Sequence, residues 1–304
     1  NIGNAHLGEF GGRDNIAKTK SEIFQGLSDT GTAIVPFGDD YFDTLLNNAQ
    51  QFTQNILTFG ERDVSLADAG VDMQQAKEIG LTDEDTVLLM GDVFADDVEV
   101  GNTSTFSLNF NFDIDEIESQ NVTLNFAGEH NISNALAAAA CAQALGLSID
   151  DIAKGLDTAK PAKGRLNFIE FGRHTLIDDT YNANPSAVIA ATQVLVSQGA
   201  PTLLVLGDIG ELGDAAQEEH RKLGEAIAAS GVTVLYTVGE LTPVTVAQAQ
   251  ASGMQAQAYP DKATLLAAIK DKLTSSDDAW HILFKGSRYM RMEQIIDELT
   301  RQPF

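Results

Sequence analysis

Cysteine and positive charge are what this sequence has least of. Its 304 residues include one cysteine, Cys141, and 19 lysines and arginines against 44 aspartates and glutamates. A single cysteine excludes a disulfide within the chain, and its place in the small-residue run 137–144 predicts a buried packing residue. The formal net charge of −25 opposes binding to nucleic acid or to anionic membranes. An anionic substrate would need local cations or metal ions.

Long apolar runs are also missing. No stretch approaches the roughly 20 apolar residues that span a bilayer, and no basic, apolar leader opens the sequence. We therefore expect a cytoplasmic protein without a membrane segment, and we expect a monomer. Hydrophobic residues make up 43% of the chain, which is enough for real cores, and the length predicts about two domains.

The stretch Asp178-Asp179-Thr-Tyr181-Asn-Ala-Asn184-Pro185 concentrates polar side chains. It follows the apolar run 174–177, which predicts a strand, and precedes 186–197, whose apolar spacing predicts a helix. Asn184-Pro185 is typical of a helix start. In an open α/β sheet such a turn lies at the carboxyl end of a strand, where ligands bind. The alternative is an ordinary polar loop that caps a helix.

After residue 163 the strand and helix patterns alternate, which predicts an α/β domain with a mostly parallel sheet. Two more polar turns follow predicted strands, at 207–213 and 285–288. Turns at the carboxyl ends of parallel strands meet at one edge of the sheet, so we predict a cleft there. Helices are expected at 186–197, 214–230, 243–252, 262–272 and 287–299, and strands at 176–178, 202–206, 233–238, 255–259 and 281–284.

The first half of the chain combines helical and alternating patterns. Residues 13–27 and 128–146 predict helices, and 86–126 predict antiparallel strands. Asn131 and Asn134 are three residues apart, so both amides fall on one helical face. A carboxamide offers a donor and an acceptor, as an adenine edge requires; the alternative is that the pair caps the helix. Residues 160–166 read as a linker in which Gly164-Arg165 presents a planar cation suited to a phosphate.

Several motifs, taken together and in order, carry a resemblance. They are NIGNAH (1–6), KTKSEIF (18–24), GEHNISNALAAA (128–139), Gly164-Arg165, DTYNANP (179–185), LGDIGELG (206–213) and KGSR (285–288). This set resembles the Mur ligase family, most of all its MurF-type branch. The resemblance implies an α/β fold: the C-terminal part of a central P-loop-type ATP-binding domain over residues 1–162, then a Rossmann-like ligase domain over 163–304.

The family's glycine-rich phosphate loop does not occur in this sequence, which contains no Gly-x-x-Gly-Lys-Ser/Thr. We therefore expect the chain to be a fragment that lacks the family's N-terminal domain and this loop. Phosphoryl transfer depends on positioning the phosphates. The chain alone is accordingly expected to be inactive.

The resemblance also implies a reaction. An ATP-dependent ligase would join D-Ala-D-Ala to UDP-MurNAc-tripeptide through an acyl phosphate, in peptidoglycan biosynthesis, with Mg²⁺ neutralising the phosphate oxygens. One alternative is a sister Mur ligase or a folylpolyglutamate-type ligase, against which the turns 181–185 and 285–287 argue. The other is a non-catalytic nucleotide-binding module that has lost the loop.

Residue roles follow from the same resemblance. For magnesium it implies His6 and Lys20, the latter as a carbamate, with Lys18 as a rival by sequence; these two and Arg165 are the catalytic candidates. His220 is interpreted as structural. The nucleotide candidates are Asn131, Asn134, Arg165, Asp179 and Tyr181, and those on the D-Ala-D-Ala side are Asp208, Glu211, Lys285, Ser287 and Arg288.

Overall fold

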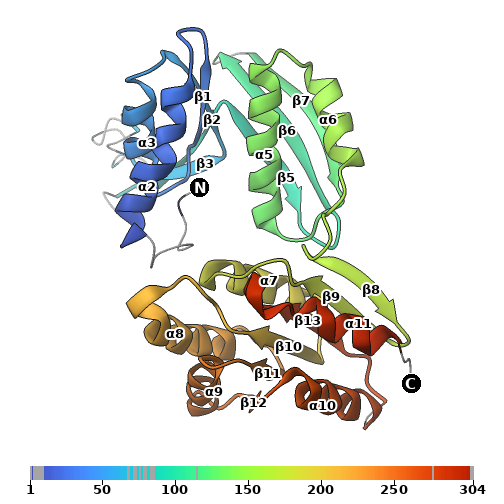
Figure 1. The fold of residues 1–304 in the computed structure, drawn as a ribbon. Coiled ribbons are helices and arrows are strands. Elements are labelled where there is room, and N and C mark those ends of the chain that lie inside the picture. Colours follow the sequence, from blue (N-terminus) through green and yellow to red (C-terminus); the bar gives the residue numbers. More distant parts are fainter. Residues whose placement is uncertain are drawn as a thin grey trace. The chain divides into compact units, whose positions relative to one another are not determined.

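The computed structural model describes residues 2, 10–66, 69–70, 74, 77, 81–82, 86–113, 116–275 and 277–301. The chain divides into two compact units. The first holds residues 14–125 and 129–159, and the second holds 126–128 and the residues from 160 onward. Both units combine helices with a sheet (Figure 1), which confirms the α/β fold class.

The sheet of the first unit mixes parallel and antiparallel strands. Its order is β1-β2-β5-β6-β7. The first two strands are parallel, and β5, β6 and β7 form an antiparallel meander, which confirms the alternation predicted there. Between β2 and β5 the register has one pair, Phe59 with Val93. The strands are β1 (Thr32–Pro36), β2 (Asn55–Phe59), β5 (Val93–Glu99), β6 (Ser104–Asp113) and β7 (Glu116–Leu124).

Helix α5 (Glu129–Ala144) lies along this sheet and buries Ile132, Leu136 and Ala139. Cys141 is exposed, so the prediction of a buried cysteine was wrong. Positions two and five residues before Cys141 face the sheet, and a helix advances 100° per residue, which turns Cys141 away from it. The other helices of this unit are α2 (Arg13–Ser21), η1 (Glu22–Gly26), α3 (Phe42–Ala49) and α6 (Ile149–Thr158).

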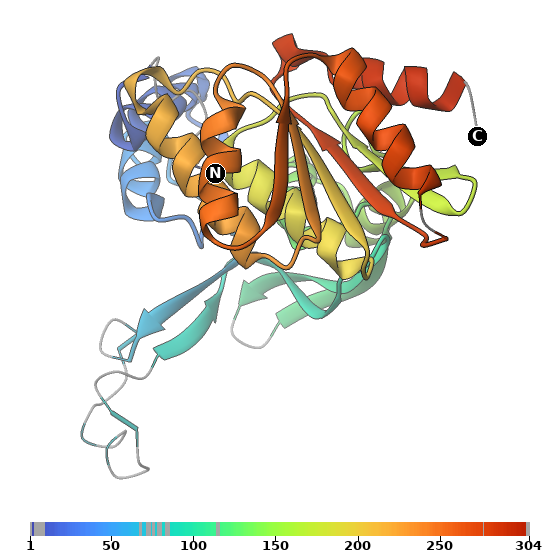
Figure 2. The ribbon, with the colours of Figure 1, turned by 90° about the horizontal axis from the view of Figure 1, so that it is seen from below.

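Strands β3 (Glu61–Ser65) and β4 (Thr86–Met90) form an antiparallel ribbon of their own (Figure 2). Only β4 was expected from the sequence. Strand β3 carries Glu61, Arg62 and Asp63, and charged residues are depleted in strands generally. The sequence of β3 therefore lacks the alternation of apolar and polar residues from which a strand is predicted.

The sheet of the second unit has the order β12-β11-β10-β13-β9-β8. All neighbours are parallel except β8, which pairs antiparallel with β9 at the edge. This confirms the mostly parallel sheet, although β8 was missed because it directly follows the linker pattern. The strands are β8 (Asn167–Phe171), β9 (His174–Asp179), β10 (Thr202–Gly207), β11 (Val234–Val238), β12 (Gln255–Tyr259) and β13 (His281–Lys285).

Helices cover both faces of this sheet (Figure 2). One apolar core holds Leu204 and Leu206 of β10 with α7 (Pro185–Ser197), α8 (Ala216–Ala229), which follows η2 (Gly213–Ala215), and α9 (Thr242–Ala251). The other holds Leu203 and Val205 with α10 (Lys262–Thr274) and α11 (Glu293–Arg301). Because β10 is buried on both faces, its sequence is a continuous apolar run and not an alternating one.

The helix predicted over 287–299 is interrupted. A short 3-10 turn, η3 (Arg288–Met290), is followed by Arg291 at φ 46°, and α11 begins only at Glu293. A left-handed residue cannot continue a right-handed helix. The Arg291 carbonyl accepts hydrogen bonds from the Gln294 N–H at 3.2 Å, at the start of α11, and from Lys262 Nζ at 3.1 Å.

Within the part of the chain that the structure describes, no helix combines the length and the apolar character needed to cross a bilayer.

His174 joins the amino-terminal ends of two strands in the second unit. Its Nδ1 accepts a hydrogen bond from the backbone N–H of Trp280 at 3.1 Å, and the side chain is buried. Burial, and to a smaller extent the charge of Arg173, lowers the pKa of His174 from its ordinary value of 6.5. The folded unit therefore favours neutral His174, and its contribution to stability is lost as pH falls from the unfolded pKa through the folded one.

We expect the free energy of unfolding of the second unit to fall as pH drops below about 7, and to fall less in His174→Gln, which cannot take up a proton. Trp280 is the only tryptophan in the chain, so urea unfolding followed by its fluorescence reads this unit. Burial also lowers the pKa of His281, so the free energy of unfolding of His174→Gln should keep some dependence on pH. Exposed His130→Gln is the control; equal pH dependence of His174→Gln and wild type would contradict the assignment.

Candidate functional site

Three polar turns meet at one edge of the second sheet, as predicted. Strands β9, β13 and β10 are parallel neighbours, so the turns that follow them share the carboxyl edge. These are the DDTYNANP turn (178–185), the KGSR turn (285–288) and the GDIGELG turn (207–213). The first leads into α7, where the Asn184 side chain accepts from the Ala187 N–H at 2.8 Å and Pro185 is the first helical residue. The predicted helix start is thus confirmed.

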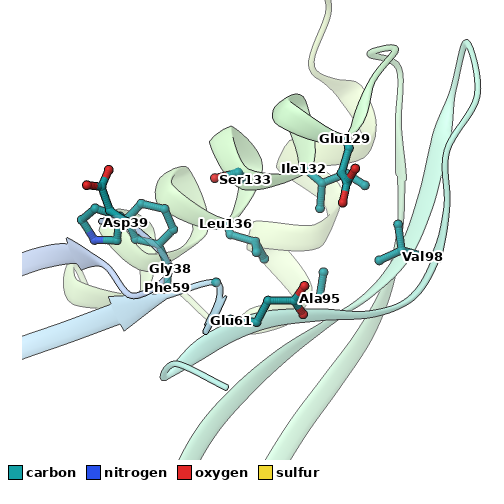
Figure 3. A pocket seen from close by; sticks show the side chains of 12 residues that line it. Gly38, Asp39, Phe59, Glu61, Ala95, Val98, Glu129, Ile132, Ser133 and Leu136 are labelled. Atoms are coloured by element: carbon teal, nitrogen blue, oxygen red, sulfur yellow. The ribbon is translucent and has the colours of Figure 1, made fainter. Parts of the chain in front are cut away.

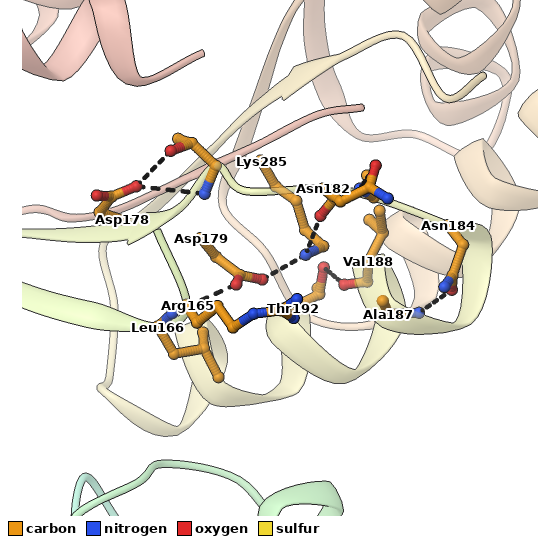
Figure 4. A network of polar contacts seen from close by, with 12 residues as sticks. Arg165, Leu166, Asp178, Asp179, Asn182, Asn184, Ala187, Val188, Thr192 and Lys285 are labelled. Atoms are coloured by element: carbon orange, nitrogen blue, oxygen red, sulfur yellow. Dashed lines mark hydrogen bonds and ion pairs between the residues drawn. The ribbon is translucent and has the colours of Figure 1, made fainter. Parts of the chain in front are cut away.

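Lys285 ties the KGSR turn to the DDTYNANP turn (Figure 4). Its Nζ lies 2.5 Å from Asp179 Oδ2 and donates to the Asn182 carbonyl at 3.0 Å. The other oxygen of Asp179 accepts from the Leu166 N–H at 3.3 Å. Side-chain exposure is 4% for Lys285 and 13% for Asp179. Both charges are therefore largely removed from water and compensate each other.

Ser287 ties the KGSR turn to the GDIGELG turn. Its Oγ accepts from the Gly210 N–H at 2.8 Å, and its own N–H donates to the Asp208 carbonyl at 3.0 Å. The next residue, Arg288, donates its N–H to Asn182 Oδ1 at 3.3 Å. The KGSR turn thus bonds to both of the other turns, a role for Asn182 that sequence reasoning missed although the residue lies within the quoted motif.

Asp208 acts within the fold. It is buried, and its carboxylate accepts from the N–H groups of Glu240, Leu241 and Thr242 at 2.7, 3.0 and 2.9 Å, at the start of α9. A helix N-terminus favours a negative charge. Gly239 permits this approach, since it has φ +146° and a Cβ there would lie 2.2 Å from Asp208 Oδ1. A direct contact between Asp208 and a substrate remains only a prediction.

His220 supports the GDIGELG turn from α8. It is fully buried, its Nδ1 lies 2.8 Å from the Ala216 carbonyl, and its Nε2 accepts from the Ile209 N–H at 3.3 Å. These partners require the proton on Nδ1, because a carbonyl accepts and an N–H donates. The structural interpretation of His220 is confirmed.

Glu211 borders an open pocket of about 750 Å³. It has φ 63°, a conformation that costs a non-glycine residue about 1–2 kcal/mol and that often marks functional sites. The pocket is lined by Asn182, Gly210, Glu211, Ser287, Arg288, Tyr289, Arg291, Glu293, Gln294 and Asp297.

Two arginines share the ring of Tyr181. The guanidinium carbons of Arg165 and Arg288 lie 4.4 and 5.9 Å from its centroid, and the ring is 49% exposed. Arg288 also pairs with Glu293 at 3.0 Å. In a chain of net charge −25, this is a local concentration of cations suited to an anion such as a phosphate. Gly164 fixes the neighbouring backbone, because its carbonyl accepts from the Tyr181 N–H at 3.0 Å and its φ is +76°.

Asn131 and Asn134 lie in the first two turns of α5 in the first unit. The Asn134 amide donates to Asn131 Oδ1 at 3.2 Å, which confirms that both side chains share one face. A pocket of about 390 Å³ lies beside the same helix (Figure 3), but its α5 residues are Glu129, Ile132, Ser133 and Leu136. The predicted adenine residues do not line it. Its α5 residues belong to the quoted motif 128–139, in which the sequence had pointed to the two asparagines instead.

The predicted metal ligands do not form a described site. His6 lies outside the described residues, and Lys18 and Lys20 are both exposed on α2, so the structure does not distinguish between the two lysines. Among the residues with described placement, no group of three or more His, Cys, Asp or Glu side chains could hold a metal ion.

Two family models together match most of the chain. Residues 1–142 match the family model of the Mur ligase middle domain, and residues 164–288 match that of the Mur ligase glutamate ligase domain. UDP-N-acetylmuramoyl-tripeptide–D-alanyl-D-alanine ligase of Escherichia coli is 33% identical over 303 residues, covering 98% of this chain and 58% of the relative. The chain thus spans less than two thirds of the length of that relative.

Solved structures give the same picture. The crystal structure of MurF from Acinetobacter baumannii superposes with a TM-score of 0.82 at 38% identity, over 99% of this chain and 58% of that one. MurF from Thermotoga maritima, solved in complex with ADP, gives a TM-score of 0.71 at 23% identity, over 99% and 60%. The second likeness supports the fold alone.

We expect Lys285→Met to lower the free energy of unfolding of the second unit by about 3–5 kcal/mol, because it leaves the Asp179 carboxylate without its counter-charge. Adding Asp179→Asn should restore part of the loss. Trp280 fluorescence in urea measures both. Lys222→Met removes a pair with Glu219 in which the lysine is 57% exposed and should cost at most about 1 kcal/mol. Equal losses in Lys285→Met and Lys222→Met would refute the role of the pair.

Proposed function

This chain belongs to the Mur ligase family, and we propose that it forms the C-terminal part of an ATP-dependent ligase that joins D-Ala-D-Ala to UDP-MurNAc-tripeptide in peptidoglycan biosynthesis. In this proposal residues 1–162 are part of the central ATP-binding domain and residues 163–304 the ligase domain. The observation that carries the proposal is that the KGSR turn holds the other two polar turns by hydrogen bonds and an ion pair. A pocket lined by residues of both charges lies beside it.

The proposed reaction has two steps. The γ-phosphoryl group of ATP passes to the terminal carboxylate of the tripeptide, giving an acyl phosphate and ADP. The amine of D-Ala-D-Ala then attacks the acyl carbon, loses a proton, and expels inorganic phosphate. A covalent intermediate of this kind divides one difficult acylation into two easier steps. Mg²⁺ would neutralise charge on the phosphate oxygens.

The nucleotide residues are proposed from the family motifs and their surroundings. The paired amides of Asn131 and Asn134 would meet adenine, since together they offer donors and acceptors. Arg165, stacked on Tyr181, would meet a phosphate group, and planar guanidinium suits that role. Asp179 is proposed at the ribose, although both of its oxygens already have partners. His6 and carbamylated Lys20 remain proposed metal ligands.

On the acceptor side, we propose that Glu211 meets the ammonium group of the dipeptide and Arg288 its carboxylate. Both border the same pocket, and opposite charges within one site suit a zwitterion. Lys285 and Ser287 would act by holding the turns that carry them, because each is buried and bonded to its neighbours. Asp208 would contribute in the same indirect way.

The proposal includes a cytoplasmic, monomeric enzyme that acts on these small molecules without nucleic acid or membrane. Family membership supports it, as does the net charge of −25, which disfavours polyanionic partners.

We expect the 304-residue chain by itself to release no phosphate from ATP above a buffer control. Its sequence contains no glycine-rich loop with Gly-Lys-Ser/Thr, and phosphoryl transfer depends on such positioning. A colorimetric phosphate assay with both substrates present measures this. Release that scales with chain concentration would contradict the expectation.

The function itself is tested with the complete ligase, meaning the gene product that contains this chain and a phosphate loop. Phosphate release should require D-Ala-D-Ala, and the pentapeptide product should appear by mass. Release with a single amino acid or glutamate would instead indicate a sister ligase. No release with any acceptor would favour a nucleotide-binding module.

In the complete ligase, Asn134→Ala should raise the KM for ATP about tenfold, the equivalent of one hydrogen bond to the base. The KM for D-Ala-D-Ala should not change. Asn102→Ala, at an exposed turn between β5 and β6, is the matched control. An unchanged KM for ATP would remove Asn134 from the nucleotide site.

A further inference from the structure

Most of the residues that line the pocket beside the KGSR turn are polar or charged. Of the side chains that line it, five are charged: Glu211, Arg288, Arg291, Glu293 and Asp297. Tyr289 is the one lining side chain with a large apolar surface, and it is 61% exposed. Among these lining residues, the ring of Tyr289 is the one aromatic surface that an acceptor with small aliphatic side chains can contact.

The ring is seated against Gly210. A Cβ added at Gly210 would lie 2.9 Å from Tyr289 Cε1, closer than real Cβ atoms come, and 3.6 Å from Cδ1. The φ of Gly210 is not in the left-handed region, so a Cβ at this position would meet the Tyr289 ring and not a strained backbone, and the ring would have to move.

The backbone beneath both residues is held in place. Gly210 donates its N–H to Ser287 Oγ at 2.8 Å, and Met290, next to the ring, donates its N–H to the Ser287 carbonyl at 2.8 Å. The backbone at Gly210 and at Met290 is therefore held by hydrogen bonds to Ser287 of the KGSR turn. The ring itself can rotate because it is exposed, whereas the position of its Cα is fixed.

We propose that Tyr289, seated on Gly210, is the specificity-determining residue of the acceptor site: its ring forms the apolar wall that contacts the small side chain of the amino-terminal residue of a short zwitterionic peptide. This rests on the proposed function, since it assigns the same pocket to the amine acceptor. The charged lining residues fix the two ends of such a peptide, and the ring limits the size of the side chain between them.

The test uses the complete ligase and compares D-Ala-D-Ala with D-Leu-D-Ala. Tyr289→Ala should raise the KM for D-Ala-D-Ala about tenfold and lower the kcat/KM preference for it over D-Leu-D-Ala about tenfold, the range for one small apolar contact. Tyr289→Phe should keep wild-type selectivity, because it retains the ring. The KM for ATP should stay unchanged in both variants.

A second test of the proposal uses a substitution at Gly210. Gly210→Ala should displace the ring into the pocket and raise the KM for D-Ala-D-Ala, with unchanged unfolding by Trp280 fluorescence. In the Tyr289→Ala background the same substitution should change the KM by less than about twofold, because residues in contact are not additive. Gly155→Ala, on α6 with no heavy atom within 4 Å of the added Cβ, should leave all constants at wild-type values.

Two outcomes overturn the inference while leaving the proposed function intact. One is an active wild type whose acceptor selectivity is unchanged in Tyr289→Ala. The other is full additivity of Gly210→Ala and Tyr289→Ala. A wild type that turns over no amine acceptor overturns the proposed function, and the inference with it.

Discussion

The ammonium group of Lys285 is the constraint on which the candidate site depends. It lies between the carboxylate of Asp179 and the carbonyl of Asn182, at the end of a strand in the middle of the sheet. A buried charge is tolerated only with a partner close by. The chain after β9 must therefore pass close to the chain after β13, and the DDTYNANP turn takes its shape from that requirement.

The other contacts at the carboxyl edge of the sheet start from the same KGSR turn. Ser287, two residues after Lys285, bonds to the GDIGELG turn, and that turn is held from behind by His220 and fastened to α9 by Asp208. Helices pack on both faces of the sheet from which these turns extend. Buried hydrogen bonds are costly to leave unmade, so each one restricts the conformations open to the turns. The exposed residues, Glu211, Arg288 and Tyr289, project from this fixed frame.

Much of this arrangement could be predicted from the sequence. The alternating patterns gave the parallel sheet of the second unit, and parallel strands necessarily bring the turns of β9, β10 and β13 to one edge. The pairing of Lys285 with Asp179 could not be predicted, because 106 positions separate them and only the strand order makes them neighbours. The interruption at Arg291 was missed because hydrophobic spacing does not report a single left-handed residue. Strand β8 was missed because it directly follows the linker pattern, and the exposure of Cys141 was missed because α5 has no strong apolar stripe.

The carboxylate of Asp208 has a wider consequence. Helix N-termini at the carboxyl edge of α/β sheets commonly serve as receptors for phosphate, through free N–H groups and the helix dipole. At α9 that receptor is already occupied by the protein's own anion, in contact with three N–H groups. The Asp208 carboxylate is part of the chain and always present, so it competes with any dinucleotide or free phosphate for the N–H groups at the start of α9. The guanidinium groups of Arg165 and Arg288 offer anions another receptor at this edge, and their position can be altered by substitution without rebuilding the backbone.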